Sequence, residues 1–110
     1  MIKKIVLLFL LPIFVYAINE ADVDKGQTYY KFILYEKLNI KGEEFTKLYT
    51  QKQWRELFSN NSKKFKEKFS KNRQMKEFMN TAKFEKIVPY LEAFTIYYAK
   101  DSNVVAQCEE

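Results

Sequence analysis

Apolar residues recur three and four positions apart along most of this chain, which is the spacing of one face of an α-helix. Polar stretches divide this pattern into short segments. The first predicted helix begins at Asp22 or Asp24, because an aspartate at a helix start caps free N–H groups and meets the positive end of the helix dipole. It ends at about Leu38, before a turn predicted over 39–42.

Two helices are predicted in the middle of the chain. The first covers residues 43–49, and Thr50 then caps the start of the second. Thr50 and Gln53 match a capping box, in which each side chain bonds the backbone N–H of the other residue. The positions expected to face the interior here are Phe45, Leu48, Tyr49, Trp54, Leu57 and Phe58.

A polar break over 59–62 ends that helix and offers a new N-cap at Ser62. Two amphipathic segments follow it, and their expected interior positions are Phe65, Phe69, Met75, Phe78, Met79 and Ala82. The last predicted helix, over 84–98, is apolar over more than half of its circumference, which indicates a central buried helix. Pro89 should kink this helix or lie in its first turn, because proline cannot donate a backbone hydrogen bond.

Turn-forming glycine and proline are scarce after residue 17, where the chain has only Gly26, Gly42 and Pro89. Small sheet-rich domains need frequent turns, so the sequence predicts an all-α fold. Sixteen aromatic residues in this region can bury enough area for a small core. We expect one domain over 18–100, a small bundle of about five short helices, and a polar C-terminal tail over 101–110.

The first seventeen residues have the pattern of a secretory signal peptide. Lys3 and Lys4 precede an apolar run, and Val15 and Ala17 place small residues at the −3 and −1 positions of a cleavage site. The run is shorter than the roughly 20 apolar residues that a membrane span needs. We therefore expect cleavage after Ala17, a periplasmic location, and no stable membrane anchor after cleavage.

The composition makes several kinds of chemistry unfavourable. The chain has no histidine, which is the commonest general base and metal ligand, and no carboxylate pair has a neighbour suited to tune its pKa. We therefore expect no catalytic residue, no metal site, no cofactor and no enzymatic activity. The formal net charge is +5, of which Lys3 and Lys4 contribute two charges. This mild charge and the expected export argue against nucleic acid as a partner.

Residues 63–76 form a basic segment with seven positive side chains and one acid, Glu67. Such a segment is either a solvated helix face that keeps the protein soluble or a docking surface for an anionic protein, lipid head group or cell-wall polymer. Phe65 and Phe69 would suit an interfacial amphipathic helix, although packing of these rings in the core is favoured. The candidate contact residues are Lys64, Lys68, Lys71 and Arg73.

The single cysteine, Cys108, has no partner for a disulfide within the chain. Its acidic neighbours Glu109 and Glu110 should raise its pKa, which makes it a poor nucleophile. Two roles stay open for Cys108: a free thiol without function, or a tether through an intermolecular disulfide, which an oxidising periplasm permits.

Two short sequence patterns resemble the small class I c-type cytochromes. ADVDKGQTYY over 21–30 is similar to their opening helix, in which an aromatic residue follows a glycine by four positions. PYLEAF over 89–94 is similar to the C-terminal helix that crosses it, and the segment 42–54 looks like small periplasmic cytochrome-like proteins of epsilonproteobacteria. The resemblance implies a crossing of the first and last helices at Gly26, Tyr30, Leu91 and Phe94.

The chain departs from that family at the haem-attachment motif CxxCH, which should follow soon after Tyr30. Residues 34–38 read LYEKL instead, so the two thiols and the histidine that covalent haem requires are missing. Met75 and Met79 offer thioethers, but a methionine without a histidine partner is not a haem site. The resemblance therefore implies a haem-less relative that keeps the scaffold without the cofactor.

These observations predict a small non-catalytic periplasmic protein. It would act as a binding or scaffold component of an envelope assembly, through contacts with a protein partner. The alternative is an accessory protein of periplasmic redox or respiratory chemistry, either as the partner of a cytochrome or as a non-covalent haem binder.

Overall fold

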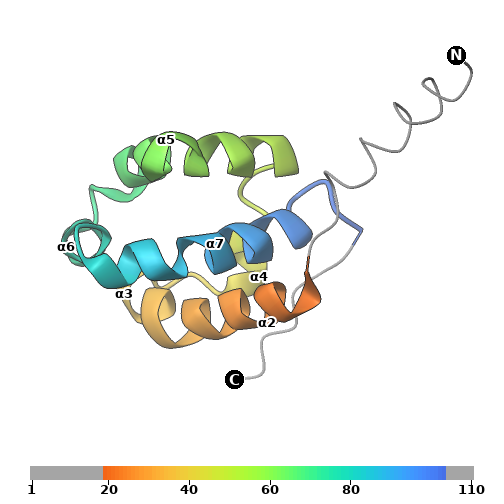
Figure 1. Ribbon diagram of the computed structural model, residues 1–110, viewed down its shortest axis with the longest axis horizontal. Coiled ribbons are helices and arrows are strands. Elements are labelled where there is room, and N and C mark those ends of the chain that lie inside the picture. Colours follow the sequence, from red (N-terminus) through yellow and green to blue (C-terminus); the bar gives the residue numbers. More distant parts are fainter. Residues whose placement is uncertain (1–18, 104–110) are drawn as a thin grey trace, which may run out of the picture.

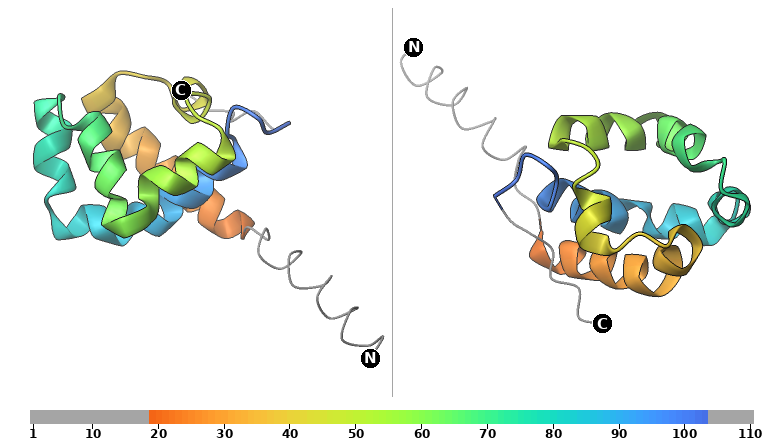
Figure 2. Two further views of the ribbon diagram at one scale, coloured as in Figure 1. Left: turned by 90° about the horizontal axis from the view of Figure 1, so that it is seen from above. Right: turned by 180° about the vertical axis from the view of Figure 1, so that it is seen from behind.

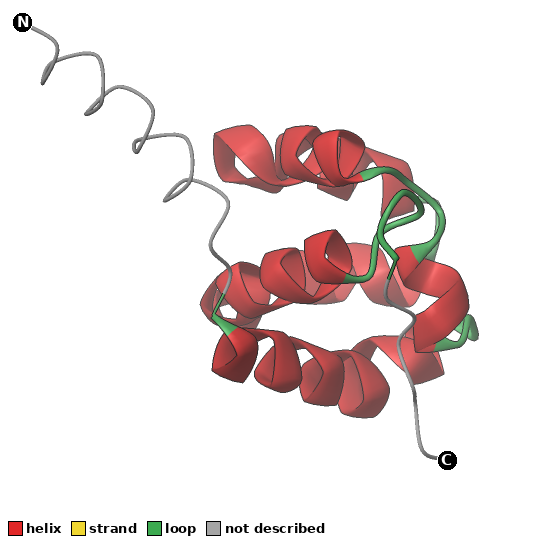
Figure 3. Cartoon of the chain, turned by 90° about the vertical axis from the view of Figure 1, so that its right-hand side faces the viewer, coloured by secondary structure: helices red, strands yellow, loops and turns green. Residues whose placement is uncertain are grey.

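The structure is a computed structural model of the chain and describes residues 19–103. The described residues contain helices and no strand, joined by short loops (Figure 3), so the predicted all-α bundle is confirmed. In chain order the elements are α2 (Glu20–Tyr29), η1 (Tyr30–Leu34), α3 (Tyr35–Leu38), α4 (Gly42–Thr46), α5 (Gln51–Phe69), α6 (Arg73–Met79) and α7 (Ala82–Tyr97). The predicted signal peptide and Cys108 lie outside the described residues.

Helix α7 is the central element of the bundle, as its apolar sequence predicts. It lies between α2 and α5 in Figure 1, and the view from behind in Figure 2 shows the same order. Thr81 caps its start by accepting a hydrogen bond from the backbone N–H of Phe84, at 3.3 Å. Pro89 is exposed and lies well inside the helix rather than in its first turn. The buried residues of α7 are Phe84, Ile87, Leu91, Phe94, Thr95 and Ile96.

Helix α2 packs against the C-terminal half of α7 at Gly26, which is buried. A Cβ atom at this position would lie 2.6 Å from the Cβ of Phe94 and closer still to the carbonyl oxygen of Tyr90. The backbones of the two helices can approach this closely only because glycine has no side chain. Tyr30 continues the contact one turn later, with its ring centre 6.0 Å from that of Phe94.

The beginning of α2 differs from the prediction. Its N-cap is Asn19, whose Oδ1 atom accepts a hydrogen bond from the backbone N–H of Ala21 at 2.8 Å. Asp22 lies in the first turn, where its charge suits the helix dipole, but neither Asp22 nor Asp24 is the cap. The helical run then passes through one π-helical turn, η1, and ends at Asn39 in the left-handed conformation, with φ of 58°.

Helix α4 is shorter than predicted, because it ends at Thr46 and not at Tyr49. Residues 47–49 form a turn, which leaves Leu48 44% exposed although it was expected to face inward. Ala82 is exposed for a similar reason, since it lies at the first position of α7. The other predicted interior positions of these segments are buried or half-buried.

Helix α5 begins with the predicted capping box, in which Thr50 and Gln53 make both reciprocal hydrogen bonds. The predicted polar break over 59–62 is also present, and it interrupts the helix within its printed bounds. Asn60, Asn61 and Ser62 have φ values of 53°, 58° and 60°, so three successive residues are left-handed. Ser62 therefore does not adopt the extended conformation typical of an N-cap.

Aromatic rings fill the space between α5 and the α2–α7 pair. Ring centres lie 4.5 Å apart for Tyr30 and Phe45, 5.1 Å for Phe45 and Trp54, and 4.7 Å for Phe58 and Phe65. The buried Trp54 Nε1 donates a hydrogen bond to the carbonyl oxygen of Thr46 at 3.0 Å. This arrangement explains how so short a chain builds a continuous core.

Candidate interaction surface

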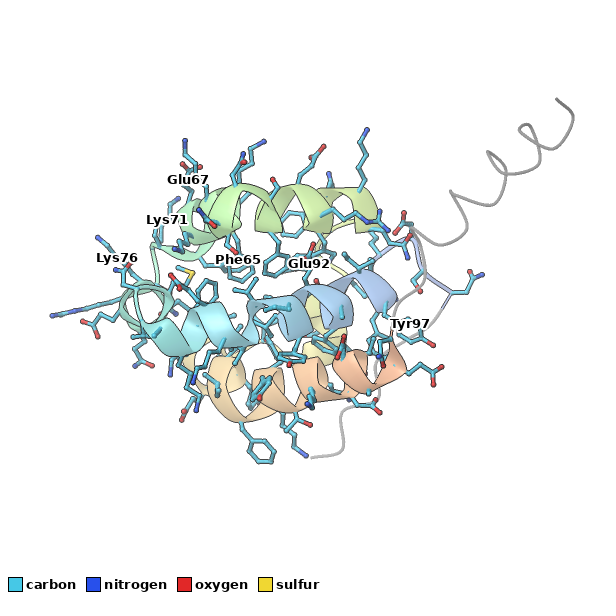
Figure 4. The ribbon with its side chains drawn as sticks, viewed as in Figure 1. Phe65, Glu67, Lys71, Lys76, Glu92 and Tyr97 are labelled. Carbon is cyan, nitrogen blue, oxygen red and sulfur yellow. The ribbon has the colours of Figure 1, made fainter. Side chains whose placement is uncertain are left out.

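The basic segment forms an exposed surface on the second half of α5, the turn after it, and α6. We call this surface the basic face; its members are Lys63, Lys64, Lys66, Lys68, Lys71, Arg73 and Lys76. The four predicted contact residues, Lys64, Lys68, Lys71 and Arg73, are all exposed. In Figure 4, Lys71 and Lys76 lie at the same end of the molecule, the end that carries α6.

The apolar residues of the same helices face the interior. Phe65 has no exposed surface, and its ring centre lies 4.7 Å from that of the half-buried Phe69. Met75 and Met79 on α6 are buried as well. The basic side chains are consequently exposed because the opposite sides of α5 and α6 supply the core, as the favoured interpretation of Phe65 and Phe69 predicts.

Few internal interactions neutralise the charge of the basic face. Arg73 pairs with Glu77 at 3.5 Å, but the two side chains are 92% and 70% exposed, so this pair contributes little to stability. Within residues 19–103 it is the one ion pair of the basic face. A group of like charges that remains unpaired creates a field that attracts anionic partners.

Lys66 differs from the other lysines of the face, because it is half-buried. Its ammonium nitrogen lies 5.9 Å from the centre of the Phe84 ring, within the range of a cation–π contact. The sequence pattern did not single out Lys66. The local sequence of a run of lysines does not show which side chain will contact a neighbouring helix.

Two hollows adjoin Lys66. The first has a volume of about 390 Å³ and lies between the left-handed break in α5 and the start of α7. Its lining residues are Asn61, Ser62, Lys66, Phe84, Glu85 and Val88. The second, of about 230 Å³, lies between the end of α5 and the end of α6. Its lining residues are Lys66, Glu67, Ser70, Lys76, Met79 and Asn80.

Asn72 fixes α6 in place beneath the basic face. Its Oδ1 atom caps α6 by accepting a hydrogen bond from the backbone N–H of Met75 at 2.9 Å. Its Nδ2 atom donates to the carbonyl oxygen of Lys37 at 2.7 Å, so one side chain links α6 to the end of α3. The basic side chains around this turn therefore lie on or beside a helix, α6, that Asn72 links to α3.

The four residues proposed for the helix crossing lie in the interior and form no accessible site. Tyr30, Leu91 and Phe94 are at most 1% exposed, and the Tyr30 hydroxyl donates a hydrogen bond to the carbonyl oxygen of Ile40. Gly26 and Phe94 meet where α2 packs on α7, Tyr30 contacts Phe94 one turn later, and Leu91 belongs to the surrounding core. Cys108, the predicted tether, lies beyond the described residues.

Glu92 is a titratable residue that the sequence did not single out. It is half-buried on α7, and Figure 4 shows it between α7 and α5. Burial raises the pKa of the Glu92 carboxyl above its ordinary value, and the positive charge of Arg55 opposes part of that shift. Among residues 19–103, no three histidine, cysteine, aspartate or glutamate side chains gather as metal ligands would.

Comparison of the chain with protein-family models, with curated proteins and with solved structures finds no match. No helix in the described part of the chain is long and apolar enough to cross a membrane.

Proposed function

We propose that this protein is a non-catalytic binding or scaffold component of an envelope assembly in the periplasm, and that it acts through protein–protein contacts. The observation that carries this proposal is the basic face, which presents exposed lysines on anchored helices with a single internal ion pair. An exposed and largely unpaired charged surface suits the electrostatic recognition of a protein of opposite charge.

The N-terminal sequence supports the location. A pair of lysines, an apolar run and small residues before Ile18 are typical of a cleaved export signal. An exported scaffold would present the basic face to other proteins of the same compartment.

We further propose that the scaffold is a haem-less relative of the small c-type cytochromes. The contact between Gly26 and Phe94 supports this, because the resemblance implies a crossing of the first and last helices at Gly26, Tyr30, Leu91 and Phe94. The missing thiols and histidine argue that such a relative works without covalent haem.

The test is co-purification from the native periplasm with a charge-reversal variant of the basic face. The variant Lys64→Glu, Lys68→Glu, Lys71→Glu changes three exposed side chains that make no ion pair among residues 19–103. The matched control, Lys41→Glu, Lys52→Glu, Lys100→Glu, makes the same change in net charge at exposed positions outside the basic face. Both should fold, because exposed substitutions change stability by about 0.5 kcal/mol each, and the contact of Lys68 with the Tyr49 ring, at 5.8 Å, contributes only about 0.5–1 kcal/mol more.

We expect a specific partner to co-purify with the wild-type protein and with the control, and to be lost from the charge-reversal variant. Equal recovery with all three proteins would contradict a role for the basic face, and a bare monomer in every case would contradict the scaffold function. Cys108→Ser, compared on non-reducing gels, tests the tether separately. A band that disappears only with this variant identifies an intermolecular disulfide.

A further inference from the structure

We propose that the two hollows beside Lys66 bind an extended acidic segment of the partner protein, and that Lys66 holds one of its carboxylates between them. This proposal rests on the proposed function. It adds the chemical class of the partner and the residues that recognise the partner. Among residues 19–103, Lys66 is the one that lines both hollows.

Lys66 is better suited to hold an anion than a fully exposed lysine. Its side chain is half-buried, with the ammonium group beside the buried Phe84 ring, so fewer rotamers are lost when a ligand binds. No carboxylate in the described part of the chain lies within 4.0 Å of its ammonium group, although Glu67 and Glu85 line the same hollows. Its charge is therefore available to a ligand.

The hollows have the size and lining expected for individual side chains of a peptide. Asn61 and Ser62 border the first one, and Ser70 and Asn80 border the second, so each offers hydrogen-bonding groups to a peptide backbone or a carboxylate. Half-buried Val88 gives the first lining an apolar surface, whereas Phe84 and Met79, which also border the hollows, are almost fully buried. Lys76 adds a second positive charge at the second hollow.

Electrostatics favours separated carboxylates over a dense anionic surface. Glu67 and Glu85 would repel negative charge at the rims, so an incoming carboxylate must be directed toward Lys66 or Lys76. The exposed lysines of the basic face would attract the acidic segment from a distance and raise its rate of association.

A lipid surface fits these observations less well. Interfacial helices insert exposed apolar side chains into the membrane, but Phe65, Met75 and Met79 are buried in the core. Within residues 19–103, the exposed large hydrophobic side chains are Phe32, Tyr35 and Leu48, which lie outside α5, α6 and α7.

The test uses fluorescence anisotropy with a labelled decapeptide of alternating glutamate and alanine, and a second peptide with glutamine in place of glutamate. The variant Lys66→Gln removes the charge and keeps most of the side chain over Phe84, and Lys52→Gln is the matched control at an exposed position of α5. Circular dichroism checks that both variants keep the helical fold. The same proteins are also mixed with vesicles containing phosphatidylglycerol.

We expect the glutamate peptide to bind the wild-type protein and Lys52→Gln, with affinity about tenfold lower for Lys66→Gln, because a charged hydrogen bond is lost. The glutamine peptide should not bind measurably. Equal affinity of wild type and Lys66→Gln, or equal binding of the two peptides, would overturn the proposal. Vesicle binding that depends on Lys66 without peptide binding would replace it with a lipid site.

The outcomes separate this proposal from the proposed function. If the native partner is lost with the three-lysine reversal but retained by Lys66→Gln, the scaffold function stands and the carboxylate site at Lys66 is wrong.

Discussion

The two ends of α7 pack against their neighbours in different ways. The C-terminal half meets α2 backbone to backbone, because Gly26 lies directly against Tyr90 and Phe94. The N-terminal end meets α5 through side chains, and the rings of Phe65 and Phe84 lie 5.9 Å apart. Backbone packing brings the two helices close together at one end, whereas packing through large rings at the other end adjoins a surface hollow between α5 and the start of α7. We call the C-terminal half of α7 its closed end and the N-terminal part its open end.

The largest effect is expected from removing a ring at the open end. Phe65→Ala should lower the free energy of unfolding by about 3–5 kcal/mol, because it leaves a cavity where a fully buried ring contacts Phe58, Phe69 and Phe84. Urea denaturation followed by circular dichroism measures this. Phe32→Ala is the control, since Phe32 is 67% exposed and its loss should change stability by no more than about 0.5 kcal/mol. Similar losses for the two variants would show that the core does not depend on Phe65.

A smaller but more diagnostic effect is expected at the closed end. Gly26→Ala should destabilise the protein by about 1–3 kcal/mol, because the added methyl group meets the Tyr90 carbonyl and the Phe94 Cβ and the helices must separate. The same substitution at an exposed helix position stabilises by roughly 1 kcal/mol, so the sign of the change decides the question. A gain in stability by thermal or urea denaturation would contradict the close approach of α2 and α7.

The smallest change in stability is expected for Glu92, which lies on α7. Because burial raises its pKa in the folded state above the ordinary value of 4.5, the folded protein binds more protons than the unfolded chain as the pH rises past that value. Stability contributed by the neutral carboxyl is present below about 4.5 and is lost as the pH rises through the folded-state pKa. Glu92→Gln should therefore be slightly more stable than wild type at pH 7, and the difference should shrink toward pH 4.

Denaturation midpoints measured from pH 4 to pH 7 check this expectation. Glu56→Gln provides the comparison, because Glu56 is exposed on α5 and its substitution should change stability by no more than about 0.5 kcal/mol. A Glu92→Gln variant that is less stable than wild type at pH 7 would mean that the attraction to Arg55 outweighs the cost of burial.

Local motifs of this chain could be read from the sequence, and properties set by tertiary contacts could not. The capping box of Thr50 and Gln53 was predictable because both hydrogen bonds join residues three positions apart. The left-handed break at Asn60 and Asn61 lies where polar residues interrupt the apolar pattern, although its backbone conformation was not predicted. The sequence therefore predicts where the helix is interrupted, but it does not predict the left-handed backbone conformation of the break.

The start of α2 was misplaced because asparagine and aspartate are comparable caps, and Asn19 stands only three positions before Asp22. Leu48 was assigned to the interior because a helix continued through it would place it beside Phe45, but α4 ends at Thr46. In the candidate site, the exposed lysines followed from the pattern. The half-buried Lys66 did not, because its position depends on where α7 lies.

The contact of Gly26 with Phe94 also has a consequence for the order in which the chain folds. These residues are roughly seventy positions apart, so their contact closes a long loop and carries the entropy cost of a distant encounter. During synthesis α2 lacks its main packing partner until α7 has been made, because α7 is the last helix of the described chain. The α2–α7 pair should therefore form late, after the local turns and caps, and the bundle should become stable only when its final helix is present.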